Sequence, residues 1–220
     1  MKRILFKMLL IFVVMVGMCG LVISQEHSHE QNQEKDRDRW MWQQPEMAMD
    51  VLGVQEGMVI ADIGAGEGYF TFRLASRIGQ KGLVYANEIN REFIKTIDER
   101  CRQEGVENIT TILGEPDDPL LPEKKIGIAL LVNLIHLVDK PVIFLKNIKP
   151  CLKPEGTLVL VQWDAKKLLT ESPGGSLEDV KEFLKEDLLK QIQTAGYEVI
   201  RTETFLSMQN IYICRPVKVN

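Results

Sequence analysis

The sequence has few cysteines and histidines, and this scarcity limits the kinds of site it can hold. Its 220 residues include four cysteines, none of them in a C-x-x-C pair: Cys19, Cys101, Cys151 and Cys214. Cys19 lies in the N-terminal apolar run, so an odd number remains in the folded part, which predicts neither a disulfide framework nor a zinc site. We expect these three residues to be small, partly buried apolar groups. No metal site is predicted.

The sequence also lacks a concentration of positive charge. It has 27 lysine and arginine residues against 31 aspartate and glutamate residues, which gives a net charge of -4. No basic stripe is present along the chain, and this argues against a protein that binds nucleic acid. An apolar fraction of 45% and a charged fraction of 26% are ordinary for a globular protein. The length suits one medium α/β domain plus an appendage.

The first 24 residues have the layout of an export signal. Three basic residues come first: Lys2, Arg3 and Lys7. An apolar run without acids follows from Met8 to Ile23, and Ser24 suits a cleavage site. Residues 1–24 are predicted to be a cleaved signal peptide or an uncleaved membrane anchor, while a lipid anchor on Cys19 is disfavoured because Met18 is not small. The positive-inside rule predicts an exported or membrane-anchored domain outside the cytoplasm, either periplasmic or secreted.

A polar stretch separates this leader from the folded part. Residues 25–39 (QEHSHEQNQEKDRDR) have no aliphatic side chain, so they are predicted to be a disordered linker. Trp40 opens a domain that we assign to residues 40–220. Met41 and Trp42 stand just before a short helix at Pro45. They are expected either to pack against the edge of the domain or to form a lid over a ligand.

Apolar strands and amphipathic helices then alternate along the chain. Strands are predicted at 58–63, 83–86, 109–113, 126–132, within 153–163, and at 197–205 and 210–214. Helices are predicted at 69–78, 91–104, 141–152 and 177–195. This order predicts an α/β fold of the Rossmann-like, doubly wound type. Its sheet is expected to have seven strands, to be mostly parallel, and to end in a C-terminal antiparallel hairpin.

A glycine-rich turn, ADIGAGEGYF at residues 61–70, follows the first predicted strand. In an open α/β sheet the ligand lies beyond the carboxyl ends of the strands, so this turn is the expected binding site. Its glycines are spaced G-x-G-x-G, whereas a dinucleotide-binding turn reads G-x-G-x-x-G. Glycine allows the backbone to approach a ligand closely, and the helix after the turn offers free N–H groups.

The charges of the turn indicate which nucleotide it binds. Asp62 precedes the glycines and Glu67 lies among them, while no lysine or arginine occurs from Gly57 to Phe72. A pyrophosphate would meet two carboxylates and no cationic side chain. S-adenosylmethionine carries an ammonium and a sulfonium, so its charges suit the turn better.

Acids also follow the second and third strands. Glu88 stands at the tip of the second strand, where a carboxylate can accept hydrogen bonds from ribose hydroxyls. After the third strand come Glu115, Asp117 and Asp118, of which one could bind the adenine amino group. The alternative for this group is a capped, solvated turn.

The chain from about Gln44 to Pro216 resembles the class I S-adenosylmethionine-dependent methyltransferases. The stretches that carry the resemblance are VIADIGAGEGYFTFRLA, VYANEI, LGEPDDPLLP, LLVNLIHLVD, LKNIKPCLKPEGTLVLVQWD and the closing GYEVIRTETFL with NIYICRP. The resemblance implies an enzyme that uses S-adenosylmethionine. It implies cofactor contacts from residues of the glycine turn and of the strand ends: Asp62, Gly64, Ala65, Gly66, Tyr69, Glu88, Ile89, Glu115 or Asp117, and Asn133.

Two positions depart from the family pattern. Asn133 stands where the family commonly has an acid, and Ile135-His136 stands where many members have two histidines. Methyl transfer from a sulfonium mainly requires alignment and exclusion of water, so a base is needed only if the acceptor must lose a proton. His136 is the candidate base, and the alternative is a histidine that caps the loop.

The sequence does not identify the methyl acceptor. The compact layout favours a small molecule, and residues 165–176, which contain Pro173-Gly174-Gly175, are predicted to form a flexible loop on the substrate side. The leader raises a difficulty, because the methyl donor is made in the cytoplasm. Two alternatives to an active methyltransferase therefore stay open: a non-catalytic nucleoside-binding protein of the same fold, and an NAD-dependent oxidoreductase.

Overall fold

A computed structural model describes residues 39–171 and 176–217. The predicted leader at 1–24 and nearly all of the predicted linker lie outside these residues. The chain divides into two compact units, Met1–Met41 and Trp42–Asn220, and the following description concerns the second. Within the described ranges, none of the helices combines the length and the apolar character needed to cross a membrane.

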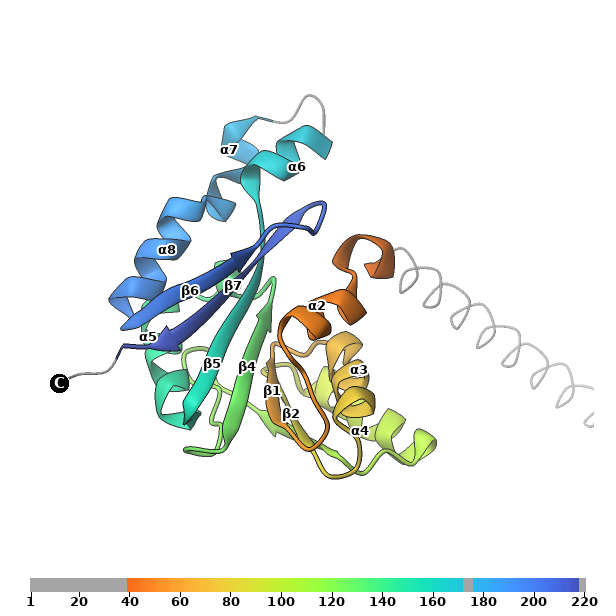
Figure 1. The fold of residues 1–220 in the computed structure, drawn as a ribbon. Coiled ribbons are helices and arrows are strands. Elements are labelled where there is room, and N and C mark those ends of the chain that lie inside the picture. Colours follow the sequence, from red (N-terminus) through yellow and green to blue (C-terminus); the bar gives the residue numbers. More distant parts are fainter. Residues whose placement is uncertain (1–38, 172–175, 218–220) are drawn as a thin grey trace, which may run out of the picture. The chain divides into compact units, whose positions relative to one another are not determined.

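The second unit is built on a seven-stranded sheet with the order β3-β2-β1-β4-β5-β7-β6 (Figure 1). The strands are β1 Val59–Ile63, β2 Leu83–Glu88, β3 Ile109–Leu113, β4 Ile126–Val132, β5 Leu152–Trp163, β6 Tyr197–Glu203 and β7 Gln209–Pro216. Strands β1 to β5 pair in parallel, and β7 runs antiparallel to both β5 and β6. The predicted doubly wound sheet with a C-terminal antiparallel hairpin is therefore confirmed.

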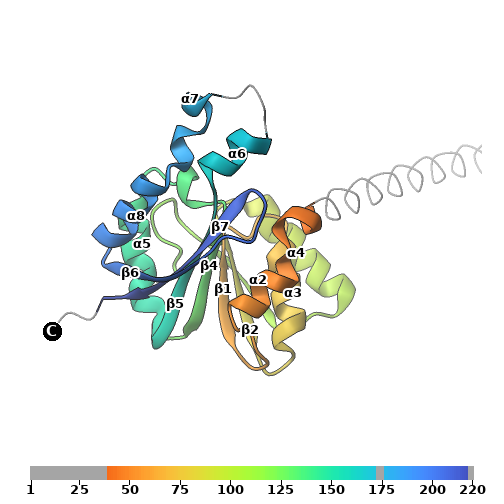
Figure 2. The same ribbon diagram turned by 45° about the horizontal axis from the view of Figure 1, so that its top comes forward.

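Helices cover both faces of this sheet. On one face lie α2 Pro45–Val51, α3 Tyr69–Ile78 and α4 Arg91–Glu104, and on the other lie α5 Pro141–Ile148 and α8 Lys185–Thr194 (Figures 1 and 2). The central strands β1 and β4 are apolar, apart from Asp62 in β1, because they are covered on both sides. Ile60 and Leu130 face one layer of helices, while Ile63 and Leu131 face the other, and all four are almost fully buried. Each such side chain contributes roughly 1.5–3 kcal/mol of burial.

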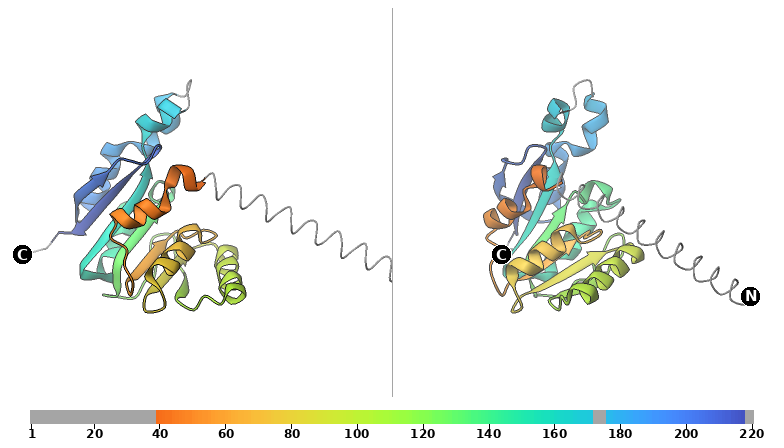
Figure 3. Two further views of the ribbon diagram at one scale, coloured as in Figure 1. Left: turned by 45° about the vertical axis from the view of Figure 1, so that its right-hand side comes forward. Right: turned by 90° about the vertical axis from the view of Figure 1, so that its right-hand side faces the viewer.

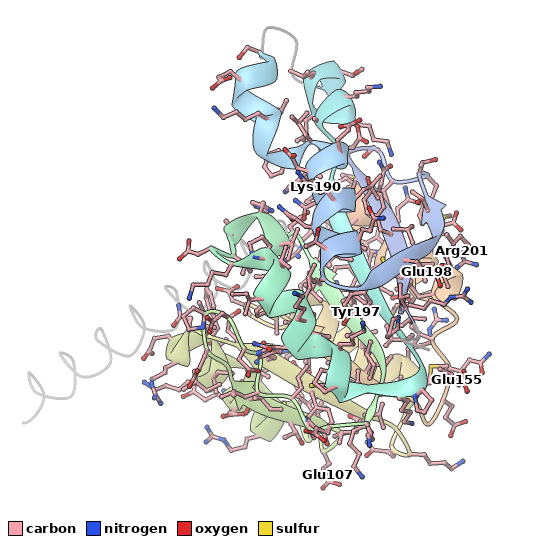
Figure 4. All side chains as sticks on the ribbon, turned by 90° about the vertical axis from the view of Figure 1, so that its left-hand side faces the viewer. Glu107, Glu155, Lys190, Tyr197, Glu198 and Arg201 are labelled. Carbon is pink, nitrogen blue, oxygen red and sulfur yellow. The ribbon has the colours of Figure 1, made fainter. Side chains whose placement is uncertain are left out.

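The apolar core under α5 and α8 also contains the hydroxyl group of a buried tyrosine. Tyr197, labelled in Figure 4, is 1% exposed and its hydroxyl donates to Leu145 O of α5 at 3.1 Å. Cys151 and Cys214 belong to the same apolar cluster, and Cys101 is partly buried, as expected. Burial raises the pKa of the Cys151 thiol to about 11 and that of Cys214 to about 12, so both are protonated at neutral pH.

The helix predicted at 141–152 is shorter than expected. α5 ends at Ile148, and a 3-10 turn, η2 Lys149–Cys151, leads into β5. Pro150 lies in this turn and has no N–H group, so it cannot continue the α-helical hydrogen bonds. The sequence-based prediction was wrong here because it extended the apolar pattern across a proline.

The long helix predicted at 177–195 is divided into three pieces. These are α7 Leu177–Val180, the 3-10 turn η3 Lys181–Phe183, and α8. Leu184 has an extended backbone (φ -66°, ψ 127°), and acids in the first turn of α8 favour a helix N-terminus there. The apolar residues keep their helical spacing on both sides of Leu184, so this spacing alone did not reveal that the helix is interrupted there.

The flexible loop predicted at 165–176 is also partly wrong. Its first seven residues form a helix, α6 Ala165–Glu171, which stands with α7 beyond the end of β5 (Figure 3). Asp164 caps this helix, since its Oδ1 accepts from the Lys167 N–H at 3.1 Å. Residues 172–175, which include the Pro-Gly-Gly stretch, lie outside the described part of the chain.

Candidate functional site

The turn between β1 and α3 has the backbone conformation that only glycine adopts without strain. Gly64, Gly66 and Gly68 have φ values of 74°, 56° and 88°. The N–H groups of Gly64 and Ala65 both donate to Asn87 O, at 2.9 and 3.0 Å, which fastens the turn to β2. A Cβ built on Gly66 would meet nothing within 4 Å, so the space over this residue is open to a ligand.

The carboxylate of Glu88, the last residue of β2, connects the second strand to the glycine turn. Its Oε2 accepts from the Gly66 N–H at 2.9 Å, and its Oε1 accepts from the N–H groups of Ile89 and Asn90 at 2.8 and 3.0 Å. A carboxylate has about four lone-pair positions, so three protein donors leave room for about one more. We expected Glu88 to receive both ribose hydroxyls, and as the side chain stands it can accept one of them. Ile89 is 58% exposed beside it, an apolar surface that a flat base could cover.

Asp62 lies buried below the glycine turn and links the two elements that flank it. It is 2% exposed, and its Oδ2 accepts from the Thr71 hydroxyl at 2.6 Å, which couples the end of β1 to the first turn of α3. Tyr69 is buried at the start of the same helix, and the Arg73 guanidinium lies 3.8 Å from the centre of its ring. Arg73 also donates to Tyr69 O at 2.7 Å. The first basic residue after the turn is therefore held against Tyr69.

The acids after β3 form a compact loop. The main chains of Glu115 and Asp118 pair, and Asp118 Oδ1 accepts from the Leu120 N–H at 2.8 Å. Asp117 Oδ2 lies 3.1 Å from Lys140 Nζ, whereas the side chain of Glu115 is exposed. Of the two candidates for the adenine amino group, Glu115 is thus the more accessible one.

Asn87, which the sequence analysis did not select, connects two loops of the candidate site. Its amide nitrogen donates to Pro119 O at 2.8 Å and more weakly to Ile112 O at 3.3 Å. Its backbone carbonyl accepts from the glycine turn, so Asn87 connects the loops after β1 and β3. A buried amide at the end of an apolar strand was the available signal, because such groups need partners.

Polar and aromatic side chains lie at or just beyond the carboxyl ends of β4 and β5 and at the start of β7, and we call five of them the acceptor wall. They are Trp42, His136, Gln162, Trp163 and Gln209. They come from both faces of the sheet, because Gln162 and Trp163 are neighbours in β5. The rings of Trp42 and Trp163 are stacked with their centres 5.0 Å apart, so Trp42 packs against the last residue of β5. Gln162 Nε2 lies 2.9 Å from His136 Nδ1, and Gln209 Nε2 donates to Asn133 Oδ1 at 2.6 Å.

The His136 contact restricts what this residue can do. If the Gln162 amide nitrogen donates to Nδ1, the neutral ring carries its proton on Nε2, where it is a donor and not a base. His136 can act as a base through Nε2 only when Gln162 turns its oxygen toward Nδ1. Phe183 of η3 packs edge-on against the imidazole, with the ring centres 4.9 Å apart.

A lysine ties the turn between β6 and β7 to α6. Lys167 Nζ lies within hydrogen-bonding distance of three carbonyl oxygens and one side-chain oxygen: Thr204 O, Leu206 O, Gln209 O and Asn210 Oδ1. Asn210 donates in turn to Asp164 Oδ2 at 2.6 Å. The start of β7, and with it Gln209, is therefore anchored to the helix that follows β5.

A separate hollow of about 550 Å³ lies at the opposite edge of the sheet. Glu155 and Glu198, labelled in Figure 4, line it together with Arg215. None of the residues predicted for the site borders this hollow. We place the site at the carboxyl edge because the glycine turn, Glu88 and the acceptor wall meet there. The described residues contain no cluster of three or more histidine, cysteine or acidic side chains that could hold a metal ion.

Comparison with known proteins assigns the class. Residues 54–209, more than half of the chain, match the methyltransferase domain family, and the chain belongs to that family. The sequence is 26% identical over 117 residues to a ubiquinone/menaquinone biosynthesis C-methyltransferase, UbiE, from Shewanella sp. strain W3-18-1, covering 52% of this chain and 46% of the relative. It is 24% identical over 114 residues to a demethylmenaquinone methyltransferase from Anoxybacillus flavithermus, covering 52% and 48%. The chain thus spans about half the length of these relatives.

Solved structures share the fold. A SAM-dependent methyltransferase from Aquifex aeolicus superposes with a TM-score of 0.71 at 24% identity, covering 80% of this chain and 91% of that one. A geranyl diphosphate C-methyltransferase from Streptomyces coelicolor gives a TM-score of 0.63 at 14% identity, with 81% of each chain covered. By family and by fold, the chain is thus assigned to the class I S-adenosylmethionine-dependent methyltransferases.

Proposed function

We propose that the protein transfers the methyl group of S-adenosylmethionine to a small molecule bound against the acceptor wall. The observation that carries this proposal is the hydrogen bond from the Gly66 N–H to Glu88, because it joins the glycine turn and the acidic tip of β2 into one cradle. The open space over Gly66 lies in that cradle. The acceptor wall stands at the ends of the strands on the other side of β1.

The residues present fit the donor by charge and by shape. Glu88 would accept a ribose hydroxyl, Ile89 would lie against the adenine, and Glu115 would reach its amino group. The N–H groups at the start of α3 suit the donor's carboxylate, while buried Asp62 supplies negative charge for its cationic groups. When bound, the donor supplies an electrophilic methyl group on a sulfonium. The same acids oppose a pyrophosphate, and this disfavours the oxidoreductase alternative.

For the acceptor, we propose an aromatic alcohol or a reduced quinone that is methylated on a ring carbon. Two relatives support this proposal: one is named as a C-methyltransferase of ubiquinone/menaquinone biosynthesis and the other as a demethylmenaquinone methyltransferase. The stacked and only partly buried Trp42–Trp163 pair offers a flat surface for a ring. In this reaction the ring carbon forms a bond to the methyl group and the sulfur leaves with the electron pair of the broken bond. The ring carbon then loses its proton, to water or to His136.

Calorimetry on the purified protein tests donor binding. We expect S-adenosylmethionine and S-adenosylhomocysteine to bind, NAD to bind far more weakly, and Glu88→Gln to lose most of the donor affinity. Glu155→Gln is the matched control, because Glu155 borders the hollow at the opposite edge of the sheet. No binding of S-adenosylmethionine at about millimolar concentration would overturn the proposal.

Turnover is tested by following S-adenosylhomocysteine release with phenols, catechols and reduced quinones as acceptors. Product formation that requires both donor and acceptor supports the enzyme. Tight donor binding without turnover on any of these acceptors, or on a metabolite extract, would favour the non-catalytic binding protein instead. Mass spectrometry of the product would locate the methyl group on carbon or oxygen.

We also propose that the domain is exported or anchored to a membrane. The support is the basic start followed by the apolar run from Met8 to Ile23. Reporter fusions after Asn220 test this topology: activity of a reporter that works only outside the cytoplasm is expected. A reporter that is active only in the cytoplasm would overturn it.

A further inference from the structure

The end of β4 presents a side-chain amide whose orientation is set from a distant part of the chain. Asn133 has a φ of 51°, in the left-handed region that asparagine tolerates better than most residues. Its Oδ1 accepts from Gln209 Nε2 at 2.6 Å, and its backbone N–H donates to Val161 O at 2.8 Å. The amide oxygen is thus tied to β7 and the main chain to β5.

Because the oxygen faces Gln209, the NH₂ group of Asn133 is directed elsewhere. Across residues 39–171 and 176–217, no protein atom accepts a hydrogen bond from Asn133 Nδ2, and the residue is only partly buried. The adjacent Leu134 packs on the glycine turn, since a Cβ added to Gly64 would come within 2.9 Å of it. An available N–H donor therefore stands where the glycine turn meets the acceptor wall.

Gln209 is itself in an unfavourable environment. Its exposed fraction is 0%, and its Oε1 has no hydrogen-bond partner in the described part of the chain. A buried acceptor without a partner destabilises the fold, and an apolar residue of similar size would avoid that loss. Among the described residues, Asn133 is the partner with which the Gln209 side chain forms a hydrogen bond.

We propose that Gln209 is a positioning residue that holds the Asn133 amide with its NH₂ group toward the ligands, so that Asn133 donates to a ligand oxygen near the transferred methyl group. This inference rests on the proposed function. The oxygen is either in the carboxylate of the donor or on the ring of the acceptor. An acid at this position, as the family commonly has, would accept hydrogen bonds and would repel both oxygens. Asn133 would instead donate a hydrogen bond here.

Asparagine at a positive φ has another explanation, which is that the turn merely needs a residue that tolerates this backbone. Asn133→Gly separates the two, because glycine adopts the same φ and removes only the side chain. Asn133→Asp keeps an oxygen for Gln209 and replaces the NH₂ group by a second oxygen. Gln209→Glu cannot donate to Asn133 when ionised, and it would turn the asparagine so that Oδ1 faces the ligands. Gln209→Leu removes the unpaired acceptor together with the anchor.

The experiment measures, for each variant of the full chain, the donor affinity by calorimetry, kcat and KM with an acceptor found in the turnover assay, and the melting temperature. We expect Asn133→Asp and Gln209→Glu each to lower either the donor affinity or kcat/KM for the acceptor by roughly 10- to 100-fold. This is the scale of one lost hydrogen bond to a charged oxygen. Asn133→Gly should lose nearly as much while its melting temperature stays within a few degrees of the wild type. Gln209→Leu should keep or raise the melting temperature and still lower the affected constant.

The constant that changes identifies the oxygen. A loss of donor affinity assigns it to the donor's carboxylate, and a loss of kcat/KM for the acceptor at unchanged donor affinity assigns it to the acceptor. Wild-type constants for Asn133→Gly would overturn the inference, because they would show that no N–H donor is needed. Wild-type constants for Asn133→Asp would also overturn it, because they would show that Asn133 presents its oxygen to the ligands. If the wild type neither binds the donor nor turns over, the proposed function itself fails, and this inference fails with it.

Discussion

The substitution Glu88→Gln tests whether the acid after β2 assembles the cofactor cradle. The carboxylate receives three backbone N–H groups, from Gly66, Ile89 and Asn90, and it is 9% exposed. A glutamine has one oxygen in place of two. If that oxygen keeps Ile89 and Asn90, the new NH₂ group faces the N–H of Gly66, and two donors oppose each other.

The expected loss follows from these contacts. One hydrogen bond to a charged acceptor disappears, at about 1.5–3 kcal/mol, and the two that remain become neutral bonds worth about 0.5–1.5 kcal/mol each. These losses together predict that the free energy of unfolding falls by about 3.5–6 kcal/mol. Because the glycine turn loses its link to β2 and the ribose loses an ionised acceptor, donor affinity should fall at least about tenfold.

Urea unfolding and calorimetry measure the two effects on the same protein. Glu92→Gln is the control, since Glu92 is exposed and its side chain pairs with Lys95 on the surface of α4, where an ion pair contributes at most about 1 kcal/mol. If Glu88→Gln unfolds at the same urea concentration as the wild type and binds the donor equally well, Glu88 does not hold the turn. The account of the cradle would then be wrong.

Three further predictions concern the turn, the β6–β7 connection and the buried thiols. Gly66→Ala should lower stability by about 1–2 kcal/mol, the cost of the left-handed backbone. It should lower donor affinity more, because the methyl group enters the open space; calorimetry that shows unchanged affinity would contradict this. Lys167→Met keeps the aliphatic stem but removes the ammonium, so amide hydrogen exchange over residues 204–210 should accelerate, whereas equal exchange rates would show that the lysine does not hold this turn. Burial raises the pKa of Cys151 to about 11 and that of Cys214 to about 12, so the stability that they contribute is fully present below pH about 9. It should be lost as the pH rises toward 11–12, and urea midpoints that stay constant from pH 9 to 11 would refute it.

Much of the fold could be predicted because the signals are local. The runs at 109–113 and 126–132 became β3 and β4 with unchanged bounds, and the helices at 69–78 and 91–104 did so too. Strand β2 continues two residues past its predicted end, which places Glu88 within the strand. Errors occurred where one residue outweighs a period: Pro150 ended α5, and Asp164 capped a helix in a predicted loop.

The candidate site divides in the same way. Asp62, the glycines and Glu88 could be selected from the sequence because each lies at or just after the end of a recognisable strand. For Asn87, Gln162 and Gln209 the sequence offers a polar amide in an apolar strand, which signals that a partner is needed but does not indicate which residue the partner is. Gln209 binds Asn133, 76 residues earlier in the chain, and Gln162 binds His136, 26 residues earlier.

The sequence alone therefore determined the order of strands and helices, the position of the glycine turn and the negative charge around it. These depend on side-chain period, on backbone freedom and on formal charge, and all three are local properties. Only the tertiary structure decided how the side chains of Glu88 and Asn133 are oriented, because hydrogen bonds with the glycine turn and with β7 set those orientations. A carboxylate or an amide has a known chemistry in any sequence, but its direction is a property of the packed sheet.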